Sequence, residues 1–199
     1  MTITAATVKE LREKTGVGMM KCKKALEEAG GDVTAAETIL RKQGAASAEK
    51  KAGRVAGEGL ISSYIHTGGK IGVLLEVNCE TDFAARSEGF VSFVKGIAMH
   101  VAAANPRYLD RESVDKDVLD REREIASDQA RQSGKPDNVV EKIVQGKIEK
   151  FYKENCLMEQ PYVRDPDQTV TQLVTEAVGR IGENIKVRRY SRFVLGDEG

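Results

Sequence analysis

The spacing of apolar residues changes near residue 57, and this change strongly limits what the chain can fold into. Over residues 1–44 the apolar side chains recur every three or four positions, which is the period of an amphipathic helix. Beyond residue 57, the runs 61–65 and 71–77 alternate around Gly68-Gly69, which is the pattern of a β-hairpin. We therefore predict an α+β fold in which a helical module precedes a small antiparallel sheet.

The first 44 residues predict three short helices separated by glycines. Thr4 is placed to cap the first helix and Asp32 to cap the third, while Gly16 and Gly30-Gly31 end the first and second. Helices of about ten residues enclose only a thin core, so we expect a small bundle that serves as a binding module. Residues 45–57, with small side chains and three cations, predict a linker whose first part can be helical.

Residues 58–199 predict an α+β core domain. A helix begins at Ser87, and two helices over about 115–153 predict an antiparallel helical hairpin. The spacing Thr169-x-x-Gln172 is a capping box that opens another helix, and alternation over about 185–195 predicts a terminal strand. We expect these helices to cover a small antiparallel sheet.

Charge and composition exclude several classes of protein. The 31 Lys and Arg residues balance 31 Asp and Glu, with 11 basic and 7 acidic side chains in residues 1–57 and 20 and 24 in the remainder. This imbalance is far too small for a DNA- or RNA-binding face, and 5% aromatic residues without Trp argue against a platform for stacking bases. No apolar stretch approaches the ~20 residues that span a bilayer. We expect a soluble protein that contacts neither nucleic acid nor membrane.

Residues that carry catalysis or bind metal ions are sparse. Cys22, Cys79 and Cys156 lie far apart, which excludes a paired disulfide framework and indicates a reducing compartment. Cys22 and Cys79 fit as small buried residues, whereas Cys156 stands in a polar stretch and is a candidate for an exposed thiol. His66 and His100 have no carboxylate or cysteine at a spacing that suggests a metal site or a nucleophile, so each is interpreted as a surface or core histidine. The sequence predicts no catalytic residues, no metal site and no cofactor.

One segment, residues 78–85, differs from its surroundings. It follows a predicted strand and precedes a predicted helix, yet it places Asp82 beside the large apolar ring of Phe83. Two interpretations remain open. Either Phe83 folds back into the core while Thr81 or Asp82 caps a turn, or Phe83 protrudes beside the acid as an interface anchor.

Several stretches of the chain resemble, in order, the signatures of the elongation factor Ts family. The resemblance covers essentially the whole chain. The stretches are LREKTGVGMMKCKKAL over 11–26, the Gly-Asp-Val pattern over 31–44, CETDFAA over 79–85, EQPYV over 159–163 and GENIKVRRYSRF over 182–193.

This resemblance implies a bacterial-type, cytoplasmic nucleotide exchange factor for the GTPase elongation factor Tu. It also implies a ubiquitin-associated-like three-helix module over 1–44 and an α+β core over 58–199. The motif Thr81-Asp82-Phe83-Ala84 is implied to displace magnesium in the partner, although the family often has Val where this chain has Ala84. An exchange factor needs no catalytic residue of its own, so we expect no enzyme activity. The alternative is an adaptor whose helical module binds ubiquitin-like or nascent-chain partners without exchange activity.

Two further contacts are expected from the same resemblance. The exposed face of the basic bundle is expected to meet the GTPase, because methionine suits an adaptable binding surface. Its residues are Val17, Gly18, Met19, Met20, Lys23 and Lys24. Longer members of the family carry a second copy of the core subdomain, and this chain has room for one. A homodimer through the terminal strand and its neighbours, without a covalent bridge, is therefore expected.

Overall fold

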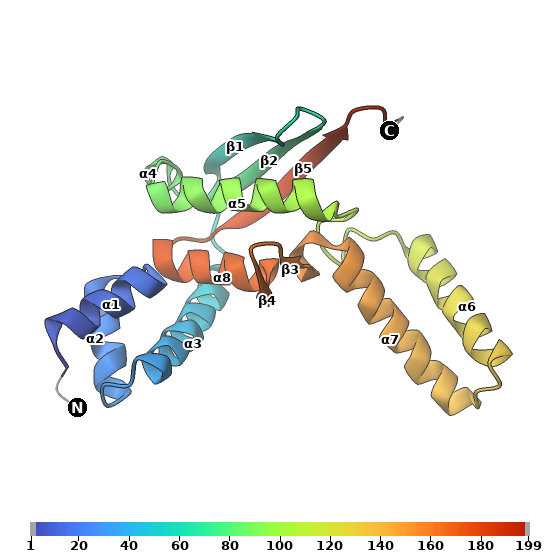
Figure 1. Cartoon of the computed structure of the whole chain (residues 1–199), viewed down its shortest axis with the longest axis horizontal. Helices are drawn as coiled ribbons and strands as arrows, with labels where there is room; N and C mark the ends of the chain where they lie inside the picture. The colour runs from blue at the N-terminus through green and yellow to red at the C-terminus, as the bar shows by residue number, and fades with distance from the viewer. Residues whose placement is uncertain (1–2, 198–199) are drawn as a thin grey trace. The chain divides into compact units, whose positions relative to one another are not determined.

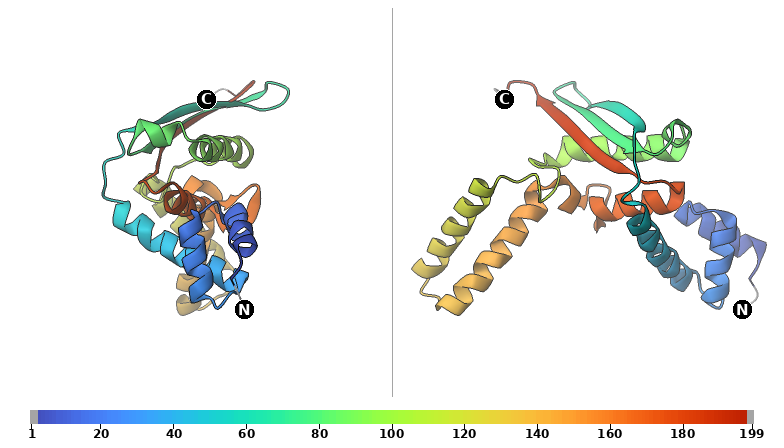
Figure 2. Two further views of the ribbon diagram at one scale, coloured as in Figure 1. Left: turned by 90° about the vertical axis from the view of Figure 1, so that its left-hand side faces the viewer. Right: turned by 180° about the vertical axis from the view of Figure 1, so that it is seen from behind.

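The computed structural model describes residues 3–197, which form two compact units (Figures 1 and 2). The first unit comprises residues 3–64, 74–98 and 172–191, and the second comprises residues 65–73, 99–171 and 192–197. Helices combine with a three-stranded and a two-stranded sheet. The predicted α+β fold is confirmed.

Three helices open the first unit, namely α1 (Ala5–Thr15), α2 (Met19–Glu28) and α3 (Val33–Lys51). The Thr4 hydroxyl accepts a hydrogen bond from the Thr7 amide at 3.2 Å, and the Asp32 carboxylate accepts one from the Ala35 amide at 3.0 Å. Gly16 ends α1 with a φ of 66°, in the left-handed region that favours glycine. These caps, and the three helices themselves, are as predicted. The helices pack around a shared core of small and aliphatic side chains: Val8, Leu11, Cys22, Ala25, Leu26, Ala36 and Leu40.

The first part of the predicted linker over residues 45–57 is helical, as that prediction allowed, because α3 continues to Lys51. A reason lies in the contact of α3 with α8 (Val170–Ile181). A Cβ atom at Gly179 would come within 3.0 Å of the Gly44 Cα, so two glycines let the helices approach closely. Arg41 also pairs with Glu176 at 3.7 Å. Tertiary packing thus extends a helix that the composition alone disfavours. The division of the chain at 44 and 58 stays a prediction.

The three-stranded sheet has the order β1 (Glu58–Ile65), β2 (Ile71–Cys79), β5 (Lys186–Val194). Gly68 and Gly69 turn the β1–β2 hairpin with positive φ values, as predicted. A Cβ atom at Gly59 would lie 2.2 Å from the Val77 carbonyl oxygen, so only glycine lets the two strands pair there.

One face of this sheet is covered by α5 (Glu88–Ala104), as Figures 1 and 2 show for its part in the first unit. Leu75 and Val77 of β2 are fully buried, as are Phe90 and Ile97 of α5. Leu74, which points to the other face of β2, is half exposed. The sheet therefore has one packed face and one open face in this region.

The second unit contains the predicted helical hairpin, formed by α6 (Lys116–Gln132) and α7 (Asp137–Asn155), which lie side by side in Figure 1. A 3₁₀ turn (Leu157–Glu159) and the short antiparallel strands β3 (Pro161–Tyr162) and β4 (Asp165–Thr169) follow. The sequence predicted only a loop there, because strands this short leave no measurable alternation.

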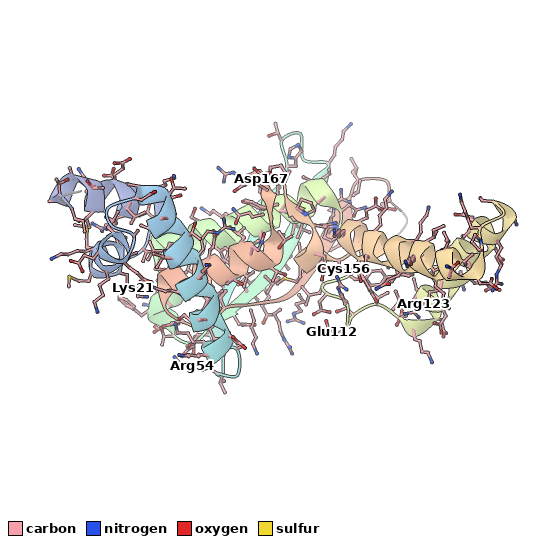
Figure 3. All side chains as sticks on the ribbon, turned by 90° about the horizontal axis from the view of Figure 1, so that it is seen from below. Lys21, Arg54, Glu112, Arg123, Cys156 and Asp167 are labelled. Atoms are coloured by element: carbon pink, nitrogen blue, oxygen red, sulfur yellow. The ribbon has the colours of Figure 1, made fainter. Side chains whose placement is uncertain are left out.

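Cys156 at the end of α7 is buried, which corrects the prediction of an exposed thiol (Figure 3). It packs with Val114 and Phe151, and desolvation by burial raises the pKa of its thiol to about 11. A thiol with so high a pKa is a poor nucleophile.

His100 is a buried core histidine. Its Nδ1 accepts a hydrogen bond from the Val163 amide at 3.1 Å, and its Nε2 lies 3.0 Å from the Gln160 side-chain oxygen. This arrangement suits the neutral ring with the proton on Nε2, and burial lowers the pKa of His100 below its ordinary value.

Candidate partner-binding site

The segment after β2 folds into a single helical turn, α4 (Asp82–Ala85). Thr81 caps this turn: its extended backbone leads in from the strand, and its hydroxyl accepts a hydrogen bond from the Ala84 amide at 3.2 Å. Ala84 and Ala85 are buried, so the turn has an inner face made of two small methyl groups. With the alanines inside, Asp82 and Phe83 occupy the outer face.

Phe83 is 85% exposed to solvent. The interpretation of Phe83 as a core residue is therefore wrong, and the interpretation as a protruding ring holds. A large exposed aromatic ring on a capped turn loses little side-chain entropy when it enters a partner's pocket, which suits an interface anchor.

The Asp82 carboxylate lies beside the ring and is also exposed. It accepts a hydrogen bond from the Arg86 guanidinium at 2.8 Å, four residues further along the chain. An exposed ion pair of this kind contributes little to stability, so the carboxylate is available to a competing cation or partner group. Arg86 is hard to identify from the sequence, because the signal it carries there is its spacing of four residues from Asp82.

The entry to α4 is fixed by residues distant in sequence. The Glu183 carboxylate, in the connection between α8 and β5, accepts hydrogen bonds from the Thr81 amide at 3.0 Å and the Thr81 hydroxyl at 2.6 Å. The buried Cys79 thiol lies 3.2 Å from the Thr81 carbonyl oxygen. Desolvation by burial raises the Cys79 pKa, which keeps the thiol protonated as a donor. Glu183 lies within a motif that resembles the family, but nothing in its local sequence indicates this contact with Thr81.

The second predicted contact surface lies at the start of α2 in the same unit. Met20 is 69% exposed and Lys23 and Lys24 are exposed, as expected of a contact surface. Met19 is 42% exposed, so a part of its side chain is open to a partner. Val17 packs against the bundle core instead of standing free.

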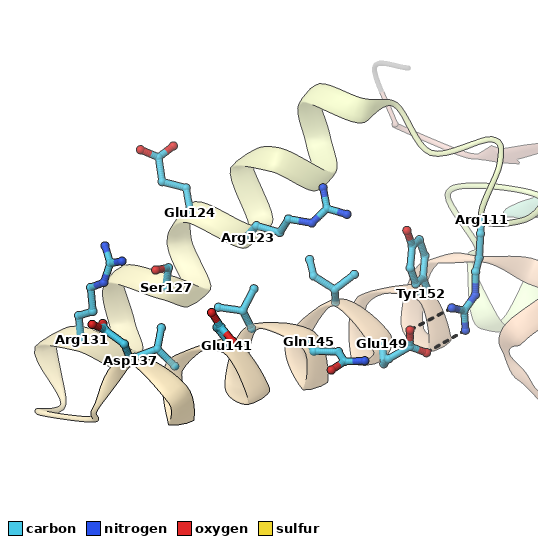
Figure 4. A pocket seen from close by; sticks show the side chains of 13 residues that line it. Arg111, Arg123, Glu124, Ser127, Arg131, Asp137, Glu141, Gln145, Glu149 and Tyr152 are labelled. Carbon is cyan, nitrogen blue, oxygen red and sulfur yellow. Dashed lines mark hydrogen bonds and ion pairs between the residues drawn. The ribbon is translucent and has the colours of Figure 1, made fainter.

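A larger hollow lies along the helical hairpin of the second unit, with a volume of about 990 Å³ (Figure 4). Its lining includes side chains of both charges, and Arg111 is the centre of a group of ion pairs at one end. The Arg111 guanidinium donates to Glu149 at 3.0 and 2.9 Å and to Glu159 at 2.7 and 3.0 Å, and it lies over the Tyr152 ring at 4.6 Å. Arg111 lowers the pKa of Glu159 by this hydrogen bond. The groove offers an ion-pair network and no nucleophile paired with a base.

Within residues 3–197, no group of three or more His, Cys, Asp or Glu side chains is placed to hold a metal ion. In the same part of the chain no helix is both long enough and apolar enough to cross a membrane.

The amino-acid sequence of this chain is similar to known proteins over nearly its whole length. The family described as Elongation factor TS matches residues 47–197 of the chain. The chain is 60% identical to elongation factor Ts of Geotalea uraniireducens and of Geobacter sulfurreducens over 197 residues, covering 99% of this chain and 91% of each relative. It is also 60% identical to elongation factor Ts of a Thermoanaerobacter species over 195 residues, covering 98% of this chain and 96% of the relative.

Proposed function

Because the chain belongs to the elongation factor Ts family of translation elongation factors, we propose that it binds elongation factor Tu in its GDP-bound state and promotes the exchange of GDP for GTP. The observation that carries this proposal is the 85% exposed ring of Phe83 beside Asp82, on a capped turn. The place of action proposed is the bacterial cytoplasm, where translation occurs.

The proposed mechanism needs no catalytic group on this chain. An exchange factor that binds the nucleotide-free GTPase more tightly than the GDP-bound form must, by reciprocity, weaken GDP binding by the same factor. Phe83 acts as a wedge that stabilises a displaced backbone in the partner. The negative charge of the Asp82 carboxylate repels the phosphate groups of the bound nucleotide. The carboxylate also competes for the groups that surround the partner's magnesium ion. Thr81 and Ala84 shape the turn that presents both groups.

A second contact is proposed for the three-helix module of residues 1–44. Its exposed methionine and lysine side chains, Met20, Lys23 and Lys24, form an adaptable apolar spot within a basic surface. This surface suits an acidic, partly apolar patch on the GTPase.

A homodimer is proposed through the terminal strand and its neighbours. In the first unit, Ile61 of β1 is 63% exposed and Leu74 of β2 is half exposed, and a hollow of about 300 Å³ is lined by these residues with Arg189 and Tyr190 of β5. Apolar side chains on an open sheet face favour burial against a second copy. Sedimentation should give a dimer at micromolar concentration under reducing and oxidising conditions alike, and a monomer would contradict this part of the proposal.

The test of exchange activity is the release of fluorescently labelled GDP from elongation factor Tu. The chain should accelerate release strongly when magnesium is present. When EDTA removes magnesium, the acceleration should shrink, because the ion to be displaced is already gone. An adaptor without exchange activity would bind the partner, or another protein, and leave the rate of GDP release unchanged.

A further inference from the structure

The connection between α8 and β5 holds the start of α4, although the two segments are about a hundred residues apart in sequence. We infer that Glu183 is a positioning residue that holds α4 in the geometry in which Asp82 and Phe83 meet the GTPase, with Asn184 and Glu80 as its supports. This inference rests on the proposed exchange function and adds to it a residue outside the magnesium-displacing motif.

The carboxylate of Glu183 uses both of its oxygens on the entry to α4. One oxygen accepts from the Glu80 and Thr81 amides, each at 3.0 Å, and the other accepts from the Thr81 hydroxyl at 2.6 Å. Since the hydroxyl proton points to Glu183, a lone pair of the Thr81 oxygen faces the Ala84 amide at 3.2 Å. Glu183 therefore orients the side chain that caps α4.

A second set of hydrogen bonds joins Glu80, Asn184 and Arg54 next to these contacts. The Glu80 carboxylate accepts from the Asn184 amide at 2.7 Å and lies 3.4 Å from an Arg54 guanidinium nitrogen. The Asn184 side-chain amide donates to the Arg54 carbonyl oxygen at 2.7 Å. Arg54 follows the end of α3, where Figure 3 labels it. Asn184 is buried with these groups satisfied, so three segments of the first unit meet around the start of α4.

The short length of α4 makes this anchor necessary. A four-residue turn is far below the length at which a helix is stable by itself, because nucleation is unfavourable. Hydrogen bonds to a carboxylate are about twice as strong as neutral ones, and here they are made at the cap. Without them the turn would fray, and the exposed ring of Phe83 would occupy many positions. In enzymes a displacement of about 1 Å in a positioned group can reduce the rate by ~100-fold.

The first test compares Glu183→Ala and Glu183→Gln with the wild type in labelled-GDP release from elongation factor Tu. Glu154→Gln is the control, because this exposed carboxylate pairs with Lys150 on its own helix, at 3.5 Å, in the second unit. We expect a loss of about tenfold for Glu183→Ala. Glu183→Gln should lose less, because its amide oxygen can still accept from the Glu80 and Thr81 amides while its NH2 group cannot accept from the Thr81 hydroxyl. The control should match the wild type. Activity of Glu183→Ala equal to the wild type would overturn the inference.

The second test uses the free protein and does not depend on the partner. Amide hydrogen exchange of Thr81 and Ala84 should accelerate at least tenfold in Glu183→Ala, and that of Ala84 should also accelerate in Glu183→Gln, while the amide of Val94, within α5, keeps its protection. Unchanged exchange at Thr81 and Ala84 would show that Glu183 does not hold the turn, and the inference would fail. Glu183→Gln, which keeps the size of the side chain, serves if Glu183→Ala does not fold.

A double-mutant cycle separates positioning from general stability. If Glu183 acts through Asp82 and Phe83, Glu183→Ala should cause a smaller further loss of GDP release in a Phe83→Ala background than in the wild type, because Asp82 alone is left to position. Independent, multiplicative losses would overturn the inference. A wild-type protein that fails to accelerate GDP release would instead remove the proposed function and this role together. An active wild type with an equally active Glu183→Ala would remove only the role of Glu183.

Discussion

The α4 turn and the α6–α7 hairpin make opposite use of charged side chains. Along the hairpin groove, Arg111 donates hydrogen bonds to the Glu149 and Glu159 carboxylates and lies over the Tyr152 ring. Its charge is therefore used within the protein. At α4, the carboxylate of Glu183 accepts hydrogen bonds from the backbone and from the cap of the turn, and the Phe83 ring on that turn is 85% exposed. The groove is larger, yet the charge of Arg111 within it is already paired. The turn is small, yet it presents a large apolar group that folding does not use.

The difference shows that the size of a hollow is a poor guide to function in this protein. A binding element is better identified by an exposed apolar side chain whose backbone is held by strong, distant contacts. Such a group costs free energy in the isolated protein and recovers it when a partner covers it. The following predictions test whether α4 serves binding and the hairpin network serves stability.

The largest effect is expected for Phe83→Ala. Stimulation of GDP release should fall by one to two orders of magnitude, which corresponds to ~1.4–2.8 kcal/mol of lost differential binding. The melting temperature should stay near that of the wild type, because the ring is exposed. Ile125→Ala, which truncates a partly exposed apolar side chain on α6, is the control and should leave release unchanged. A loss of ~3–5 kcal/mol in the free energy of unfolding would contradict this prediction, because it would indicate that Phe83 packs in the core.

A smaller effect is expected for Met20→Ala on α2. Affinity for elongation factor Tu should weaken about three- to tenfold, since one exposed, flexible side chain is lost from the second contact. Isothermal titration calorimetry measures the change. Lys9→Ala, on the exposed surface of α1, provides the matched control. Equal affinity of Met20→Ala and wild type would remove this surface from the proposal.

The hairpin should respond in stability and not in exchange. Arg111→Ala removes the hydrogen bonds to Glu149 and Glu159 and the contact with Tyr152. Because these side chains are partly exposed, we expect a decrease of about 1 kcal/mol in the free energy of unfolding. Urea denaturation measures it, and labelled-GDP release by the folded variant should equal that of the wild type. A loss of exchange activity would contradict the contrast between the two regions.

The smallest effect concerns pH and the buried His100. Burial lowers its folded pKa below the ordinary value of 6.5, so the unfolded chain binds more protons than the folded chain as pH falls through that value. Stability should therefore be highest above pH 6.5 and decline below it. His100→Gln should flatten this decline between about pH 7.5 and 5.5, as thermal denaturation at each pH measures. If the stability of His100→Gln declined with falling pH as steeply as that of the wild type, this role of His100 would be contradicted.

Local signals were sufficient for much of the fold. Thr4, Gly16 and Asp32 cap or end helices through contacts within one turn, so their sequence context predicts them. The hairpin at Gly68-Gly69 is equally local. Cys156 was misjudged because a polar sequence neighbourhood says nothing about the distant Val114 that covers it.

For the site, the sequence by itself determined that an acid and an aromatic ring stand together between a strand and a helix. It left open whether Phe83 is buried or exposed, because a single turn with two alanines permits either orientation. Tertiary structure decided this. Ala84 and Ala85 take the inner face, and Glu183, brought near by β5 pairing with β2, fixes the cap at Thr81. Hydrogen bonds between segments a hundred residues apart have no period or local spacing in the sequence, so only the folded chain reveals them.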